Sequence, residues 1–348
     1  LRNNKVRLWR MMIHRRSLIA SAAAMVAVPR IAISSESPRW QRRAEMPWAT
    51  QEIYCAVLEG RIYVAGGLIR DAITTRINDR VGIYDPAADI WTEGPRLAQP
   101  RHHPMLAAAR GRVWAFGGYD RREGGEWTSM TDYWALDGDV WHPVGQMPQP
   151  LAETVGVTVG DRVHLVTGRS PLGGKNGQWN DQADVATHLV FDAANNSWST
   201  ARPAPEARNS AAGAAHGGHV YVAGGRMVEG GRGTGRLDRY DPATDQWDTL
   251  SPIPVSSSGH QVGGGLALAT VGDRLVAFGG EWLTRPGGVF TETWIYDINT
   301  DDWTRGPDMG VPRHGLAGCS VDGVVYAIAG GEVYSGGKAS SVVEALRV

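Results

Sequence analysis

Short apolar runs separated by glycine-rich turns make up most of the chain. In the stretch 207–247, the apolar run 220–223 ends in the doublet Gly224-Gly225, and two further short segments flank an aspartate-proline turn at Asp241-Pro242. Short segments bounded by Gly-Gly, Asp-Pro and Asp-Gln pairs are typical of β-strands joined by tight turns. The pattern predicts a unit of four short antiparallel strands.

This unit recurs six times along the chain. Each copy has an apolar run that ends in a doublet, and a tryptophan returns every 49 to 57 residues. A unit of about 50 residues that cannot bury its own apolar face predicts a repeat architecture, here the blades of a β-propeller. The doublets are Gly66-Gly67, Gly117-Gly118, Thr167-Gly168 (a degraded copy), Gly224-Gly225, Gly279-Gly280 and Gly330-Gly331, and the tryptophans are Trp40, Trp91, Trp141, Trp198, Trp247 and Trp303.

The last unit is one strand short and has no closing tryptophan. The segment near Trp40, at the N-terminal side of the first doublet, is an additional strand that belongs to no other unit. We therefore expect an all-β fold, a six-bladed propeller in which the N-terminal strand completes the last blade and leaves no exposed sheet edge.

The repeated marks resemble those of kelch repeats. A glycine doublet is followed by an aromatic-aspartate pair and then by a tryptophan, as in Tyr84-Asp85 with Trp91, Tyr240-Asp241 with Trp247 and Tyr296-Asp297 with Trp303. The second unit departs, with Leu136-Asp137-Gly138-Asp139 before Trp141. The resemblance covers residues 36–348 and implies a kelch β-propeller.

Charge divides the chain into two parts. Residues 1–34 carry seven basic and no acidic side chains, and the remainder holds 28 basic and 36 acidic side chains, a net charge of −8. An acidic body of this kind disfavours nucleic acid and anionic membranes as partners. We expect one propeller domain over residues 35–348.

The first segment has the order of a signal peptide. Arg15-Arg16 precede a short, alanine-rich apolar run at 21–28, and small residues follow near 32–34. This order indicates export, and the paired arginines indicate the twin-arginine route to the periplasm, without stable membrane insertion after cleavage. A disordered basic tail is the alternative. Residues 1–10 precede Met11 and Met12, and an extension of the gene model is one interpretation of them.

Two cysteines remain after such a cleavage, Cys55 and Cys319. Each falls in the first strand of a unit, in the first and last units, which are neighbours if the ring closes. Buried free thiols and a disulfide across the closure are both open, since an oxidising compartment allows the bond and its geometry is demanding.

The candidate site follows from strand direction. In an antiparallel blade, residues just before the first strand and just after the doublet lie at the same end, so they should meet at one mouth of the channel. We expect this mouth to bind substrate through Glu52, Arg101, His103, Glu153, Arg169, Arg208, Asn209, Arg226, Trp282 and Arg313. The same two sets and the loops beyond include Gln51, His102, Gln261, His314, Tyr119, Glu332, Trp127 and Trp179.

These residue types suit a polar anion such as a sugar acid. Arginine recognises carboxylates with two parallel hydrogen bonds, tryptophan offers a flat face to a sugar ring, and glutamate or histidine moves protons. A purely structural role is the alternative for Arg101, Arg208 and Arg313, because arginine at this position of a kelch repeat often forms ion pairs within the fold. For the histidines and the two later glutamates, Glu281 and Glu332, the alternative is a mouth or loop residue that has no role in binding or catalysis.

No metal site or cofactor is expected. The scattered histidines lack the spacing of a metal site, and the tyrosine, histidine and cross-linked cysteine set of the copper-radical kelch oxidases has no match.

A second resemblance concerns function. Residues 258–269 before Gly279-Gly280, and Glu332 with Gly336-Gly337, look like the last two blades of the exported six-bladed kelch proteins that include N-acetylneuraminate epimerases (mutarotases). That family has its proposed proton acceptor, a glutamate, directly after the fourth doublet. This chain departs from it, with Arg226 there.

Three hypotheses follow. The first is a cofactor-free mutarotase or epimerase for a sugar acid, with Glu281 and His260 as acid and base. The second is a propeller without catalysis that binds a glycan, or a periplasmic protein, through its loops. A lyase or hydrolase is a third reading, which no nucleophile motif supports.

Overall fold

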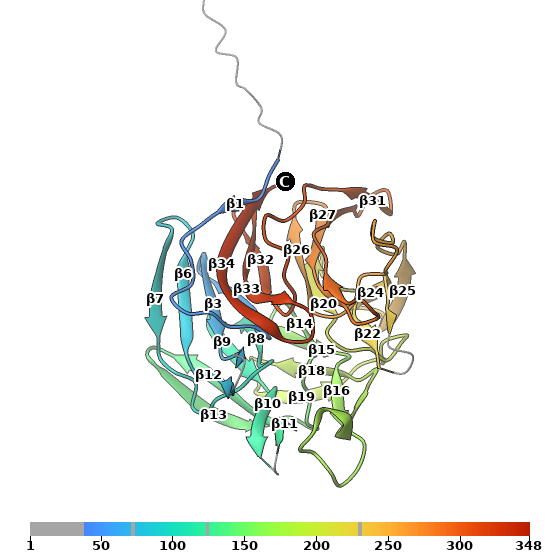
Figure 1. The fold of residues 1–348 in the computed structure, drawn as a ribbon. Helices are drawn as coiled ribbons and strands as arrows, with labels where there is room; N and C mark the ends of the chain where they lie inside the picture. The colour runs from blue at the N-terminus through green and yellow to red at the C-terminus, as the bar shows by residue number, and fades with distance from the viewer. Residues whose placement is uncertain (1–37, 71–73, 123–124, 229–231) are drawn as a thin grey trace, which may run out of the picture. The chain divides into compact units, whose positions relative to one another are not determined.

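A computed structural model describes residues 38–70, 74–122, 125–228 and 232–348, and residues 38–348 form one compact unit. The expected signal segment lies outside the described residues. Figure 1 shows six sheets set around a central axis. Each has four antiparallel strands, which we number as blades 1 to 6 in chain order.

Blades 1 to 3 follow the chain from their inner to their outer strand. Blade 1 comprises β2 (Cys55–Leu58), β3 (Arg61–Ala65), β6 (Val81–Asp85) and β7 (Ile90–Gly94). Blade 2 comprises β8 (Met105–Ala109), β9 (Arg112–Phe116), β12 (Asp132–Asp137) and β13 (Val140–Gln146). Blade 3 comprises β14 (Val155–Val159), β15 (Arg162–Val166), β18 (His188–Asp192) and β19 (Ser197–Thr200).

Blades 4 and 5 repeat this order, and blade 6 joins the two ends of the chain. Blade 4 comprises β20 (Ala212–His216), β21 (His219–Ala223), β24 (Leu237–Asp241) and β25 (Gln246–Leu250). Blade 5 comprises β26 (Leu266–Val271), β27 (Arg274–Gly279), β30 (Thr293–Asp297) and β31 (Asp302–Arg305). Blade 6 comprises β32 (Ala317–Val321), β33 (Val324–Val333), β34 (Gly337–Arg347) and the N-terminal β1 (Gln41–Arg42).

The expected closure is confirmed. Strand β1 pairs with β34, with Gln41 opposite Ala345, and the inner strands β2 and β32 of the first and last blades are in contact. Beside β1, Trp40 packs on Phe278 of blade 5 and donates its indole N–H to Thr293 Oγ1 at 3.0 Å. The two chain ends therefore seal the same blade.

The core lies between blades rather than within them. The described residues contain six clusters of buried side chains, and each one joins two neighbouring blades, as Leu106 and Ala65 join blades 1 and 2. This arrangement is the physical reason for the repeat, since a single unit gains a buried face only from its neighbour.

Five small hairpins extend blades 1 to 5 at one end of the channel. They connect the second and third strands of each blade and rise over the mouth. The hairpins are β4 (Leu68–Arg70) with β5 (Thr75–Ile77), β10 (Tyr119–Arg122) with β11 (Gly125–Ser129), β16 (Arg169–Pro171) with β17 (Gln182–Asp184), β22 (Arg226–Met227) with β23 (Arg232–Gly233), and β28 (Glu281–Trp282) with β29 (Gly288–Val289). A short 3₁₀ helix, η1 (Trp179–Asp181), lies in the blade 3 hairpin.

The doublets mark a repeated left-handed backbone. Gly66 and Gly67 have φ of 69° and 103°, and Thr167 and Gly168 have φ of 59° and 110°, so the degraded copy keeps the conformation. A Cβ on Gly67 would lie 2.2 Å from Thr50 Oγ1, which explains the glycine at the second place.

The sixth doublet is displaced by one residue from its expected place. The equivalent left-handed pair is Ala329 (φ 53°) and Gly330 (φ 102°), and Gly331 forms the β-bridge with His314 that Arg226 forms with Asn209 in blade 4. The assignment of Gly330-Gly331 as the sixth doublet was therefore wrong by one residue: Gly331, rather than Glu332, follows the structural doublet.

Candidate functional site

The mouth is built on a ring of six equivalent backbone positions, one before each inner strand. Their φ angles lie between 49° and 73°, the left-handed region, and amide hydrogen bonds of 2.8 to 3.0 Å link most of them to the preceding blade. This mouth ring consists of Glu52, His103, Glu153, Ser210, Gly265 and Gly315. Four of the six positions carry a side chain.

A second set lies beside the mouth ring. In five of the six repeats, the residue before the ring position forms a β-bridge with the residue that follows a doublet, as His102 does with Tyr119 and Asn209 with Arg226. In blade 5 the Glu281 amide donates to the Gly264 carbonyl at 3.0 Å. The expectation that these two parts of each repeat meet at one mouth is therefore confirmed.

Glu153 is the most heavily hydrogen-bonded carboxylate of the mouth. Its Oε1 accepts from Tyr119 Oη at 3.1 Å and Trp179 Nε1 at 2.9 Å. Its Oε2 accepts from Ser210 Oγ at 2.6 Å and lies 3.4 Å from Arg226 Nη2. Burial favours the neutral acid, but His103, Arg226, Arg169 and the Ser210 hydroxyl prevail and lower the pKa of Glu153 to about 2.

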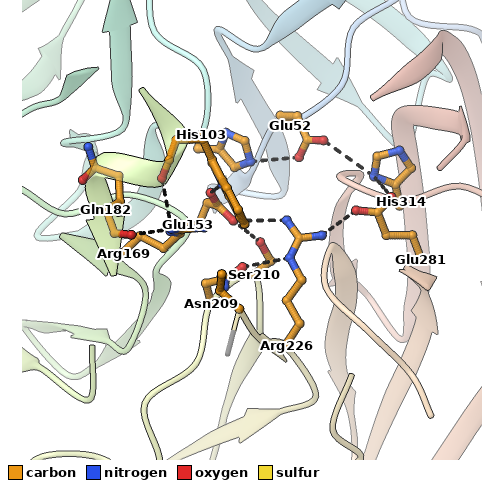
Figure 2. Close-up of polar contacts among 12 residues, drawn as sticks. Glu52, His103, Glu153, Arg169, Gln182, Asn209, Ser210, Arg226, Glu281 and His314 are labelled. Carbon is orange, nitrogen blue, oxygen red and sulfur yellow. Dashed lines mark hydrogen bonds and ion pairs between the residues drawn. The ribbon is translucent and has the colours of Figure 1, made fainter. Parts of the chain in front are cut away.

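Arg226 connects three blades. Its Nη1 lies 2.6 Å from Glu281 Oε1, its Nη2 approaches Glu153, and its Nε donates to Asn209 Oδ1 at 3.0 Å (Figure 2). Asn209 is held in turn by Asp184 Oδ1 at 2.7 Å. Burial opposes its charge, yet the surrounding carboxylates raise the pKa of Arg226 above the ordinary arginine value, so it is a permanent cation.

Glu52 lies between two histidines. Its Oε2 is 2.9 Å from His103 Nε2, and its Oε1 is 3.6 Å from His314 Nδ1, as Figure 2 shows. Burial again favours the neutral acid, but His103, His314 and Arg226 outweigh it and hold the pKa of Glu52 far below its ordinary value. Glu52 is therefore ionised at neutral pH.

The hydrogen-bond directions fix the protons of His102 and His103. The Glu126 carbonyl can only accept, so His102 carries its proton on Nε2, 2.7 Å away. Burial lowers the pKa of His102 to about 3, which leaves its Nδ1 as an acceptor for His103 Nδ1–H at 2.9 Å. His103 also donates from Nε2 to Glu52, so it is an imidazolium.

A cavity of about 410 Å³ opens beside this network, between the hairpins of blades 4 and 5. Arg226 and Glu281 belong to both the network and the cavity wall. The wall consists of Trp179, Arg226, Met227, Val228, Arg232, Gly233, Gly259, His260, Gln261, Gly263, Gly264, Glu281, Trp282, Leu283 and Thr284.

The aromatic side chains of the cavity are held in place by neighbours. Trp282 stacks on His260, with ring centroids 5.1 Å apart and planes inclined by 20°, and packs against Phe290 at 4.8 Å. Trp179 has the Arg169 guanidinium 3.6 Å from its ring centroid. His260 therefore reaches the cavity as part of a stacked wall, outside the charged network.

Three of the arginines expected at the mouth pair with carboxylates of their own blades; like Arg169, they are fully buried and do not line the cavity. Arg101 pairs with Asp120 and Asp132. Arg208 pairs with Asp238 at 2.9 Å, and Arg313 with Glu344 at 2.9 Å. Their guanidinium groups fill the structural role that was the alternative for them.

The remaining expected site residues divide between the network and the cavity. Glu52, His103, Glu153, Arg169, Asn209 and Arg226 belong to the network with Glu281, and His260 and Trp282 belong to the cavity wall. Sequence reasoning gave no role to His314, Tyr119 or Trp179, although it placed them at the mouth, and it missed Ser210 and Asp184. Ser210 had a signal: it occupies the ring position of Glu52, His103 and Glu153.

Two properties concern the described residues alone. They include no group of three metal-ligating side chains placed to hold an ion, and no helix with the length and hydropathy to cross a membrane. Both cysteines are free thiols; the hydrogen bond that the Cys319 thiol donates to Cys55, together with burial, raises the pKa of Cys319.

Comparisons with known proteins agree with the repeat. A family model described as the Kelch motif matches residues 55–98, 207–254 and 263–310. Kelch-like protein terF of Aspergillus terreus is 28% identical over 84% of this chain and 63% of its own length. Kelch-like protein 23 of Homo sapiens is 24% identical over 64% of this chain and 45% of its own length. The chain thus spans less than two thirds of these relatives.

A solved structure shares the fold. The structure of YjhT superposes with a TM-score of 0.70 at 16% identity, covering 86% of this chain and 95% of that one. With the motif matches and the six four-stranded sheets, this defines the class: the chain is a kelch-repeat β-propeller.

Proposed function

We propose that the protein is an exported, cofactor-free mutarotase or epimerase that acts on a sugar acid or a similar polar anion at the channel mouth. One observation carries the proposal: a carboxylate, a guanidinium and an imidazole, from Glu281, Arg226 and His260, face one cavity of about 410 Å³. A volume of this size suits a small ligand such as a monosaccharide.

Anomer exchange needs only acid and base groups. The ring opens when the anomeric hydroxyl loses a proton and the ring oxygen gains one, and two side chains placed on either side of the sugar can perform both transfers. Glu281 and His260 take these roles. Arg226 and Arg232, both in the wall, supply the positive charge for a carboxylate.

The test is anomer exchange measured by NMR on the protein from residue 35 onwards. Glucuronate and N-acetylneuraminate are the acidic probes, glucose is the neutral one, and the uncatalysed rate is subtracted. The double variant Glu281→Gln with His260→Gln should lose about 100-fold in rate. Glu332→Gln serves as the control, because Glu332 pairs with Lys338 outside the cavity wall. Unchanged exchange in the double variant overturns the proposal.

A binding protein without catalysis is the second candidate, and the partners of Glu281 favour it. Oε1 of Glu281 is held by Arg226, and its Oε2 accepts the Ser335 amide N–H at 2.6 Å, so the carboxylate is already satisfied. Exposed Val228 and Leu283 at the cavity lip would contact a glycan or a periplasmic protein. Tight binding of a probe without exchange of its anomers would select this function.

A further inference from the structure

His314 holds an unusual place at the mouth. It precedes β32, is 1% exposed, and its Nε2 lies 3.1 Å from the Val333 carbonyl oxygen. Its Nδ1 faces two carboxylates at nearly equal distances, Glu52 Oε1 at 3.6 Å and Glu281 Oε2 at 3.7 Å. The ring therefore links the network carboxylate to the cavity carboxylate.

The neutral form of His314 leaves this arrangement incomplete. A carbonyl oxygen only accepts, so the first ring proton belongs on Nε2. The lone pair of Nδ1 then faces two negative oxygens without a proton between them. A second proton on Nδ1 replaces this repulsion with two charge-assisted contacts.

The charges around His314 are otherwise balanced. The carboxylates of Glu52, Glu153 and Glu281 stand against the cations of Arg169, Arg226 and His103. Glu52 and Glu281 face the His314 ring directly, and His103 and Arg226 lie behind them. One more negative charge at the cavity would give the cluster a net negative charge, which one added proton would neutralise.

We propose that His314 takes up a proton when an anionic sugar binds in the cavity, so that anion binding and protonation of this histidine are coupled. The inference rests on the proposed function. The bound carboxylate competes with Glu281 for the Arg226 guanidinium, and protonated His314 becomes the replacement partner of Glu281. A neutral sugar takes no charge from Arg226 and draws no proton.

The coupling gives the site a preference for acids that depends on pH. By linkage, protonation of His314 strengthens anion binding by the same factor as the anion strengthens protonation. Affinity for the acid should therefore rise as pH falls, by at most about tenfold per pH unit, while affinity for the neutral sugar stays constant.

Calorimetry of the protein from residue 35 onwards tests the coupling. Glucuronate, N-acetylneuraminate and glucose are titrated in two buffers of different ionisation enthalpy at pH 7 and 8. We expect uptake of up to about one proton per bound acid and none for glucose. The variant His314→Gln should bind the acid without proton uptake, whereas His142→Gln, an exposed histidine on β13, should behave as the parent does.

If the His314→Gln variant does not fold, NMR of the unaltered protein tests the same coupling. The ¹⁵N signals of the His314 ring should move to imidazolium values when the acid is added and stay unchanged with glucose. Acid binding without this shift and without proton uptake overturns the coupling, as does a complete failure of all acids to bind. If the protein binds the acid with proton uptake but does not exchange its anomers, the proposed catalysis is overturned and the coupling stands.

Discussion

Trp303 donates its indole N–H to the Ser251 carbonyl at 2.7 Å, across the boundary between blades 5 and 4. Trp91 and Trp247 make the same contact with the blade before their own, at 2.9 and 3.0 Å. The repeated tryptophan thus fastens each outer strand to its neighbour. Blade 3 is different, because Trp198 Nε1 is buried without a hydrogen-bond partner.

This difference gives a matched pair of variants. Trp303→Phe should lower the free energy of unfolding by about 1 kcal/mol more than Trp198→Phe, because only the first leaves a carbonyl unpaired. Urea unfolding at pH 7 measures both. Equal losses would assign the role of the tryptophans to packing alone.

A buried histidine pair should make stability fall in mild acid. His164 Nδ1 and His188 Nε2 lie 2.9 Å apart between blades 3 and 4, and His188 Nδ1 bonds to the Arg202 carbonyl. Burial, with the neighbouring ring, lowers the pKa of His164 to about 3, and burial lowers that of His188 to about 4.

The sign follows from linkage. Below the ordinary histidine pKa of about 6.5, the unfolded chain takes up protons that the folded pair refuses, so stability is complete above that pH and is lost towards pH 4. The slope should approach about 1.4 kcal/mol per pH unit for each histidine. In the double variant His164→Gln with His188→Gln, the urea midpoint should change less between pH 6.5 and 4 than it does in the parent protein. His142→Gln is the control, and an unaltered profile in the double variant contradicts the argument.

Glu153→Gln should destabilise the mouth by about 3 kcal/mol, because it removes one charge from a buried, hydrogen-bonded cluster and leaves Arg226 undercompensated. Asp161→Asn is the comparison: Asp161 pairs with Arg110 at the surface, both about half exposed, so its loss should be small. Thermal unfolding of the two variants measures the difference. A loss no larger than that of Asp161→Asn would show that the cluster adds nothing to stability.

Trp40→Ala should cost about 3 kcal/mol, since it removes the packing on Phe278 and the bond to Thr293 that seal the last blade. Val140→Ala, at an exposed position on β13, should have little effect. Denaturant unfolding decides whether the N-terminal segment is required for closure.

The repeat allowed the fold to be predicted, because turn glycines, aspartates and tryptophans recur with the period of a blade. The repeat pattern misplaced the last doublet. Ala329 there adopts the left-handed conformation that glycine adopts in most of the other doublets, so the pair Gly330-Gly331 was assigned in place of Ala329-Gly330. Sequence alone does not report which residue bears a positive φ.

The site was harder to predict for a related reason. Arg101 and Arg226 are both mouth arginines by position along the strands, yet one turns into its blade and the other spans three blades. Strand direction predicts which end of the sheet a residue reaches, whereas the partner of its side chain depends on residues in other repeats. His314 gained its importance only when Glu52 and Glu281 were brought around it.

The mouth ring presents different side chains on one repeated backbone conformation. Main-chain hydrogen bonds link most of its six positions, and its side chains add stability of their own, as expected for Glu153. Gly265 and Gly315 leave two of these positions bare, and a side chain at Gly315 would displace the Glu52 carboxylate 2.5 Å away. A side chain added to or removed from the ring therefore changes its ring neighbours as well as the surface that a ligand meets.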